Sequence, residues 1–454
     1  MSIIPAYGDN KTNGKGNEKA KEYIKELLPL RNVDEKPLYR VVQNDSIFIR
    51  DITFNKLENY TRAYIVGKLK IKKNTKIPVT QIEKGISNLN ATQNFSAISY
   101  SFEKTQKGER LTLNLKENKN NTFLKFGLHY DDLFKSGVLV NLTNKNTLFK
   151  NDLASLDLVL GDNFRYNLDY YIDNGFNFSF GFKSQFNQFN KNVSQNITDL
   201  NLGSFGINEI NVDFMDLSTQ AYLQKGLAQS FLVGAGVEVK YLRISSQTLA
   251  IANPIIDKSS YWSGFGYVKF DSFDNKYFPK QGLYFTADFQ SYLFSSDYNN
   301  NFKPFSIFKA NFEKAVTIWD KLILKFQGDG GLPIGNDGVP FFNFVLGGYG
   351  YNSINNFRPF YGYDFLSVAA NSYIKVTGTI DYEFYRKNHL NFSANFANLG
   401  DNLFQSGDWI AFPKHSGYAV GYGLETAIGP IEAKYSWSPE NAKGYTWFSV
   451  GFWF

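Results

Sequence analysis

From about residue 122 to the end of the chain, apolar and polar side chains alternate with a period of two in one short segment after another. Phenylalanines occupy every second position from Phe176 to Phe182, and the stretch from Leu390 to Phe396 repeats the pattern. Such alternation predicts strands with one apolar and one polar face. In a soluble sandwich the apolar face packs on a second sheet, whereas in an outer-membrane barrel it faces lipid and the polar face lines the lumen. The alternation by itself leaves both architectures open.

The length of this alternating region favours the barrel. Its 333 residues, 122–454, give about 16 segments of roughly 21 residues, enough for a membrane-spanning strand and a turn or loop in each. We place the strand starts near residues 122, 137, 153, 165, 176, 207, 229, 260, 281, 303, 320, 371, 388, 414, 430 and 444. A bacterial single-chain barrel needs an even number of strands, and an open sheet this long is unusual. We therefore predict a mainly β protein with a 16-stranded antiparallel transmembrane β-barrel over residues 122–454.

The end of the chain carries a local signal for closure of the barrel. Phe448, Val450, Phe452 and Phe454 share one face of the last strand, with Gly451 between them. An exposed strand this apolar would aggregate at the end of a soluble protein. Paired with the first strand in lipid, it would close the barrel.

Residues 46–121 have a different texture, because the hydrophobic period changes from two to about 3.6 and back again. We predict a strand near Ile47, helices over residues 61–69 and 80–89, and two further strands over residues 97–103 and 111–117. The expected order is β-α-α-β-β, in one small α/β domain.

Residues 1–45 are predicted to form a linker with one short helix, residues 17–28. The segment lacks the basic start, apolar core and small-residue cleavage site of a signal peptide. For a protein that must be exported, we expect that the sequence begins downstream of its natural start or that an N-terminal portion has been removed.

Composition narrows the chemistry that the chain can perform. It has no Cys, three His and two Met, which excludes thiolate metal sites and leaves little material for any metal centre. No Ser has Gly at both positions two residues away, so the nucleophile elbow of a serine hydrolase is absent. We expect no cofactor, no metal and no catalytic residue in this chain.

The basic excess is confined to residues 1–121, which carry 22 Lys and Arg against 13 Asp and Glu. No basic stripe interleaved with stacking aromatics accompanies it, so we expect a solvated basic surface and no nucleic-acid partner. The 44 Phe, 29 Tyr and 6 Trp point instead to lipid, since aromatic residues line both membrane interfaces of outer-membrane barrels.

Several motifs together resemble one family. Leu346-Gly347-Gly348 leads into Phe357-Arg358-Pro359-Phe360-Tyr361-Gly362-Tyr363, and Gly429-Pro430 opens the segment that precedes the terminal strand. With the α/β module and the sixteen strands, these motifs resemble the bacterial surface-antigen superfamily of outer-membrane assembly and secretion barrels, the BamA, TamA and FhaC type. The resemblance covers about nine tenths of the chain and implies a POTRA domain over residues 46–121.

Within this superfamily the chain is most similar to the POTRA and barrel half of patatin-like phospholipases of the Bacteroidetes type. Residues 3–9 and the helix that follows resemble the end of a patatin domain. This resemblance implies that the hydrolase domain is missing or is encoded separately.

The resemblance also implies a loop over about residues 330–370 that folds back into the lumen. In the family an arginine of this loop pairs with acidic residues of the barrel wall; here Arg358 would be the arginine and Glu383 an acidic partner. A guanidinium in a confined lumen needs such a carboxylate. Asn398 stands where the family has a second acid, and Pro359 where it has Gly, which weakens the clamp. The alternative is that Arg358 binds only loop carbonyls.

Four functions are consistent with these motifs. The first is an outer-membrane barrel that anchors, positions or helps to translocate a periplasmic polypeptide or a patatin-like domain, bound at the POTRA strand edge near residues 97–103. The second is an insertase that opens between the first and last strands, alone or with the barrel assembly machinery; short pairing of these strands would favour it. The third is the membrane-anchor half of a patatin-like phospholipase, and a diffusion porin is a weaker fourth. Each function places the barrel in the outer membrane and the N-terminal region in the periplasm, without catalysis by this chain.

Overall fold

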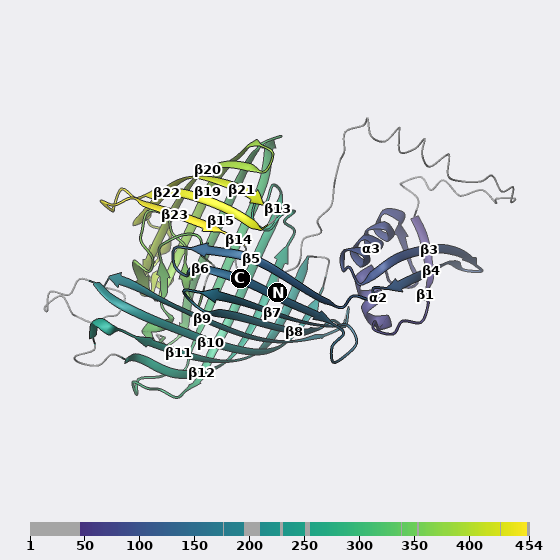
Figure 1. The fold of residues 1–454 in the computed structure, drawn as a ribbon, viewed down its shortest axis with the longest axis horizontal. Helices are drawn as coiled ribbons and strands as arrows, with labels where there is room; N and C mark the ends of the chain where they lie inside the picture. Colours follow the sequence, from purple (N-terminus) through teal and green to yellow (C-terminus); the bar gives the residue numbers. More distant parts are fainter. Residues whose placement is uncertain are drawn as a thin grey trace. The chain divides into compact units, whose positions relative to one another are not determined.

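The computed structural model describes residues 46–175, 177–194, 209–227, 230–249, 255–336, 338–351, 354–426 and 428–451. The helix predicted over residues 17–28 and the patatin-like residues 3–9 lie outside this range. The chain divides into two compact units: residues up to Leu57 with Lys68–Asn118, and Glu58–Gly67 with Lys119–Phe454 (Figure 1). No helix among the described residues is long and apolar enough to cross a bilayer.

The N-terminal region is a small α/β structure. Its elements are β1 (Ser46–Phe54), α2 (Arg62–Leu69), β2 (Thr75–Pro78), α3 (Val79–Ala91), β3 (Phe95–Thr105) and β4 (Gly108–Glu117). The sheet order is β2-β1-β4-β3, with β1 parallel to β4 and the other pairs antiparallel. The predicted order lacked β2, which has four residues and one buried apolar side chain, Ile77, too little for a periodic signal.

The core of this region follows from two local patterns. Ile49 and Ile52 of β1 are both fully buried although they are three residues apart, because the register with β4 shifts between Ile49 and Asp51. A bulge of this kind rotates the following side chains to the other face. In α3 the buried positions are Val79, Ile82, Gly85 and Leu89, the spacing of one helix face.

Sixteen antiparallel strands form a closed barrel, as predicted. Their bounds are β5 (Thr122–Asp131), β6 (Lys135–Lys145), β7 (Asp152–Gly161), β8 (Arg165–Ile172), β9 (Ser179–Ser194), β10 (Glu209–Gly226), β11 (Phe231–Ser245), β12 (Ile255–Asp271), β13 (Gly282–Ser295), β14 (Phe305–Trp319), β15 (Leu322–Gly335), β19 (Ser372–Tyr385), β20 (Asn388–Gly400), β21 (His415–Thr426), β22 (Gly429–Trp437) and β23 (Tyr445–Val450). The largest error in a predicted start is at β12, placed near residue 260 and found at Ile255. We refer to the end of the barrel where β5 begins as the near end and to the opposite end as the far end.

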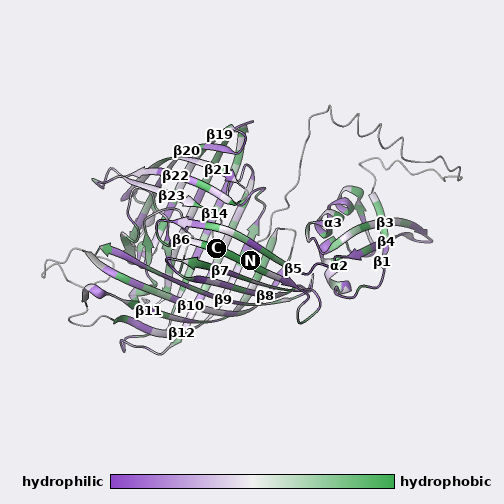
Figure 2. Cartoon of the chain, viewed as in Figure 1, coloured by the Kyte–Doolittle hydropathy of each residue, from purple (hydrophilic) through white to green (hydrophobic). Residues whose placement is uncertain are grey.

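The two faces of each strand differ as the alternation predicted. On β5, Leu124, Phe126 and Leu128 are exposed on the outer wall. His129, the residue after Leu128, is buried and faces the interior. Figure 2 shows hydrophobic and hydrophilic positions alternating along the barrel strands. Apolar side chains therefore cover the surface that faces lipid, and polar ones line the lumen.

The lumen is filled in part by the connection between β15 and β19. This lumen loop, residues 336–371, contains the short helix η4 (Pro340–Phe342) and a three-stranded sheet of β17 (Phe357–Arg358), β16 (Phe344–Leu346) and β18 (Val368–Ala370), in that order. Its buried apolar side chains form one cluster with inward-facing residues of the wall, among them Phe189, Phe214, Tyr261, Tyr292, Phe305, Tyr373 and Trp447. The barrel core is thus made between the loop and the wall.

Candidate functional site

The lumen loop brings together the two motifs singled out in the sequence. Gly347 donates its backbone N–H to the carbonyl of Arg358 at 3.1 Å, and Gly348 donates to the carbonyl of Tyr363 at 3.0 Å. Phe360 in turn donates to the carbonyl of Gly348 at 3.0 Å. Gly362 lies in the same loop, where a Cβ would stand 2.5 Å from the carbonyl oxygen of Trp437 on β22.

Gly347 is the position where the loop depends most on a glycine. Its φ is +144°, and a Cβ would lie 1.9 Å from the carbonyl oxygen of Asp364. A side chain would therefore both strain the backbone and clash with the segment that precedes β18. This is why a Gly-Gly pair sits where β16 turns toward the second motif.

The predicted pair of Arg358 and Glu383 is not formed. Arg358 donates from Nε to the hydroxyl of Tyr373 at 3.1 Å and from a terminal nitrogen to the carbonyl of Phe357 at 3.1 Å. Tyr373 and Glu383 are both on β19, ten residues apart, which is about 33 Å along a strand. Glu383 lies near the other end of the barrel, where it pairs with Lys280.

The acidic wall residue beside Arg358 is Asp329, which the sequence analysis missed. Asp329 of β15 binds Lys375 of β19 at 3.2 Å, and Lys375 also donates to the carbonyl of Pro359, the residue after Arg358, at 3.0 Å. Lys375 thus connects the backbone of the loop to the carboxylate. Both Asp329 and Lys375 are buried inward-facing residues of strands; the polar phase of the alternation marks them, but nothing in the sequence pairs them with Arg358.

Asn398 was expected in the lumen and faces outward instead. On β20 the inward residues include Asn391, Ser393, Asn395 and Ala397, all buried, whereas Leu390 and Phe392 are exposed on the lipid side. Asn398 shares the phase of Leu390 and Phe392, and its register partner on β19 is Ile374. Its side chain holds the β20–β21 loop and has no part in a lumen clamp.

A polar cavity of about 510 Å³ lies between the lumen loop and the wall. Both signs of charge line it, from Lys309, Arg358, Lys375, Lys434, Asp288, Asp329 and Glu432. Ligand pockets are usually lined by apolar and aromatic side chains with few polar groups, so this lining fits a hydrated lumen. No group of three or more His, Asp or Glu among the described residues is arranged to hold a metal ion.

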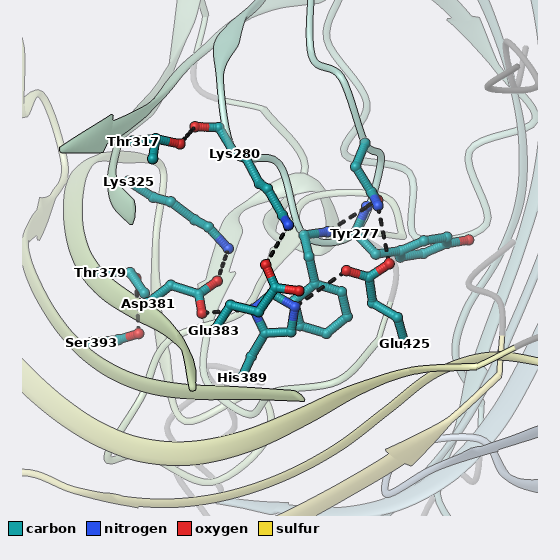
Figure 3. Close-up of polar contacts among 12 residues, drawn as sticks. Tyr277, Lys280, Thr317, Lys325, Thr379, Asp381, Glu383, His389, Ser393 and Glu425 are labelled. Carbon is teal, nitrogen blue, oxygen red and sulfur yellow. Dashed lines mark hydrogen bonds and ion pairs between the residues drawn. The ribbon is translucent and has the colours of Figure 1, made fainter. Parts of the chain in front are cut away.

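A second charged cluster lies at the near end, shown in Figure 3. His389 at the start of β20 is fully buried, with Nδ1 2.9 Å from Asp381 and Nε2 3.2 Å from Glu425. Carboxylates at both nitrogens favour the doubly protonated ring, since each nitrogen then donates. The cluster fixes the β12–β13 turn to the wall, because Lys280 of the turn binds Glu383 and the ring of Phe278 stacks on His389 at 4.4 Å.

The seam between β5 and β23 is short. A single register pair, Val450 with Tyr130, joins the two strands among the residues described up to Gly451. On its other edge β5 pairs with β6 over ten residues. The closure residues Phe452 and Phe454 lie outside the described residues.

Side chains supplement this pair on the outer face and at the far end. The rings of Phe448 and Tyr130 lie 5.8 Å apart, and the N–H of Phe448 donates to Asp132 at 3.1 Å. Gly451 donates to the carbonyl of Pro430 at 2.9 Å, which ties the end of β23 to the Gly429-Pro430 start of β22. Among the described residues, β23 therefore pairs with β22 over six residues and with β5 over one.

The lumen loop supports the β22–β23 side of the seam from within. Trp447 of β23 meets the ring of Phe365 edge to face at 5.0 Å, and Tyr349 donates its hydroxyl to Glu432 of β22 at 2.8 Å. At the far end, Glu440 in the β22–β23 turn accepts from the hydroxyl of Ser416 at 2.7 Å and from Ser438. Slight burial opposes ionisation of Glu440, but these hydrogen bonds hold its pKa below the usual value.

Comparisons with known proteins agree with this geometry. A family model described as the OMP85 superfamily matches residues 109–454. Among solved structures, BamA from Haemophilus ducreyi lacking POTRA domains 1-3 is similar with a TM-score of 0.62 and 13% identity, over 89% of this chain and 84% of that one. CdiB from Acinetobacter baumannii is similar with a TM-score of 0.56 and 14% identity, over 89% of this chain and 73% of that one. No curated protein sequence matches the chain.

Proposed function

Since the chain belongs to the OMP85 superfamily, we propose that it inserts polypeptide into the outer membrane by opening its barrel between β5 and β23. The observation that carries the proposal is that a single register pair joins β5 and β23 among the residues described, up to Gly451. Opening a strand junction costs the backbone hydrogen bonds of its ladder, each worth about 0.5–1.5 kcal/mol net. One pair can therefore be opened at far lower cost than the ten pairs between β5 and β6.

The N-terminal region supports a function in handling polypeptide. We assign it as a POTRA domain, with β2 as a short addition to the expected order. In the sheet order β2-β1-β4-β3, the edge strands are β2 and β3. No other described strand pairs with the outer edge of β3, where most residues are exposed. An extended peptide can add to such an edge through main-chain hydrogen bonds, which would deliver an unfolded substrate to the barrel.

A reversible lock across the seam tests the proposal. The chain has no native Cys, so Tyr130→Cys with Val450→Cys, a facing pair, creates one possible disulfide. In cells that depend on this chain, we expect the oxidised variant to lower the amounts of outer-membrane proteins as far as depletion does, and a reductant to restore them.

The matched control places the same bond on the other edge of β5. Phe126→Cys with Val140→Cys joins a facing pair of β5 and β6, which the proposal does not require to open. We expect this control to leave outer-membrane protein levels unchanged. Full activity of the oxidised seam lock would rule out insertion through this opening.

A second candidate function is the anchoring or translocation of one partner, and the position of β3 at the edge of the described sheet favours it. Depletion of the chain separates the two functions. A general loss of outer-membrane proteins supports the insertase, whereas loss of a single periplasmic or surface protein supports the anchor.

A further inference from the structure

The loop between β20 and β21, residues 401–414, folds back onto the outer wall of the barrel. Asn398, on the lipid-facing phase of β20, donates its amide to the carbonyls of Asp408 at 3.2 Å and Ala411 at 3.0 Å. Its amide oxygen accepts the N–H of Lys414 at 2.8 Å. One outward side chain thus holds the middle and the end of the loop, and the loop in turn buries that side chain to 3% exposure.

The beginning of the loop is held on the same face. The helix α4 (Leu403–Ser406) starts where Leu403 donates to the hydroxyl of Ser372 at 3.2 Å. Ser372 faces Gly400 in the β19–β20 register, so it has the same outward phase as Asn398. Leu403 is buried, and it is not part of the cluster that fills the lumen.

The loop held in this way presents apolar side chains to its surroundings. Trp409 is 42% exposed, Ile410 73% and Phe412 91%. The ring of Phe404 stacks on Trp409 at 6.1 Å and supports it from the helix. Three large apolar side chains on a short ordered loop are costly in water, since each Å² of apolar surface costs about 25 cal/mol.

The position of the loop suggests what covers these side chains. On the lipid face of β20 the apolar stripe runs from Leu390 to Phe396, six residues or about 20 Å along the strand, and the next position is Asn398. Aromatic rings gather beside the end of this stripe on the neighbouring strands β21 and β22. The ring centre of Tyr418 lies 6.1 Å from that of Phe396 and 5.9 Å from that of Trp437. Aromatic residues at the edge of the apolar band mark the membrane interface.

We propose that the β20–β21 loop is an interfacial anchor, which inserts Trp409, Ile410 and Phe412 into the lipid leaflet at the far end of the barrel. The occupant is lipid, because the loop continues an apolar surface that lipid already covers. Lys414, exposed at the end of the loop, is placed to meet phosphate groups of the lipid headgroups. Asn398 is the positioning residue, since it holds the loop against the wall.

Fluorescence quenching by lipid tests this proposal on the full chain. Because the chain has no Cys, Ile410→Cys accepts one environment-sensitive fluorophore, and the protein is reconstituted in phosphatidylethanolamine and phosphatidylglycerol vesicles with brominated acyl chains. Leu390→Cys places the fluorophore on the exposed lipid face of β20 and gives the quenching of a lipid-embedded site. Asn301→Cys, exposed in the β13–β14 loop at the same end, sets the value for a loop in water.

We expect the fluorophore at position 410 to be quenched as strongly as the one at position 390, with a blue-shifted emission. Adding Asn398→Ala should move the value at position 410 toward that at position 301, while the barrel itself stays folded, as judged by heat-modifiable migration. A fluorophore at position 410 that is no more quenched than that at position 301 would overturn the proposal and leave a protein partner as the occupant. Unchanged quenching in the Asn398→Ala background would refute the positioning function of Asn398.

Discussion

The two edges of β5 are closed in different ways. Toward β6 the strand has ten register pairs, and β9 and β10, further along the same wall, are joined by sixteen. Toward β23 the described residues contain one pair. The strong junctions are held by their own backbone ladders, whereas the seam is held by side chains that reach it from the lumen loop and from the far end.

This difference matters because backbone ladders and side-chain contacts can be lost independently of one another. Sixteen ladder pairs at about 0.5–1.5 kcal/mol for each hydrogen bond remain closed whatever the lumen contains. The seam, by contrast, has one register pair among the described residues, and the contacts of the lumen loop with Trp447 and Glu432 support only its β22–β23 side. We expect that loss of these loop contacts makes the seam easier to open, and the following variants test this link in order of decreasing effect.

The largest effect is expected from Gly347→Ala, which removes the loop as a support. The new Cβ would stand 1.9 Å from the carbonyl oxygen of Asp364 at a φ of +144°, and we expect a loss of about 4 kcal/mol in the stability of the loop. Hydrogen exchange should accelerate on β23 and leave β9 and β10 protected. Gly335→Ala is the control, because Gly335 also has a positive φ, +90°, but open space around its Cβ position. If the rate of hydrogen exchange on β23 were equal in both variants, the stability of the seam would not depend on the lumen loop.

A smaller loss should follow from Trp447→Ala, which removes the contact of β23 with Phe365. Trp447 is buried and also donates to the hydroxyl of Ser436 at 2.7 Å. Truncation of a buried Trp costs about 3–5 kcal/mol of stability. Here the loss destabilises both the lumen loop and β23, because Trp447 packs between them. Trp437→Ala on the outer face of the adjacent strand is the matched control. We expect single-channel recordings to show more frequent opening for Trp447→Ala than for the control. The reverse order would contradict the inference that the lumen loop supports β23.

A local effect is expected from Asp132→Ala at the far end of the seam. Asp132 accepts the N–H of Phe448 at 3.1 Å and the hydroxyl of Tyr130 at 3.3 Å. Loss of these bonds should cost about 1 kcal/mol and speed hydrogen exchange at Phe448. Asp162→Ala breaks comparable bonds to Ser136 at the same end, between β6 and β7. This control should leave the exchange of Phe448 as it is in the unmodified chain.

The smallest effect is a pH dependence that arises from Glu440. Because the pKa of Glu440 is lower in the folded protein than the ordinary value of 4.5, its contribution is present above pH 4.5 and is lost as the pH falls through the folded pKa. Opening of the seam, measured by channel recordings, should therefore increase on acidification below about pH 4.5. Glu440→Gln should remove this part of the pH dependence. The group is exposed, so the change is a modest one.

Much of the barrel could be predicted because a spanning strand repeats its environment every two residues. Each strand start was placed within five residues, even at β12, since lipid and lumen select opposite side chains along every strand. β2 was missed because four residues with one buried apolar side chain carry no period. The prediction for Asn398 was wrong because it rested on the family pattern. The alternation of β20 itself puts Asn398 in phase with Phe392 and Phe396, on the outer face.

The sequence by itself determined the sixteen strands and their two faces, because the alternation of each strand depends on neighbours along the chain. It also marked the glycine motifs of the lumen loop, but the need for glycine at Gly347 comes from Asp364, which only the tertiary structure brings close. Tertiary structure alone decided that Arg358 meets Tyr373 rather than Glu383, that Lys375 joins Asp329 to the carbonyl of Pro359, and that His389 lies between two carboxylates. The contacts of Arg358 and Lys375 join the lumen loop to the wall. They form only when the loop folds back against β15 and β19, and no local pattern encodes that placement, because it depends on packing between residues distant along the chain.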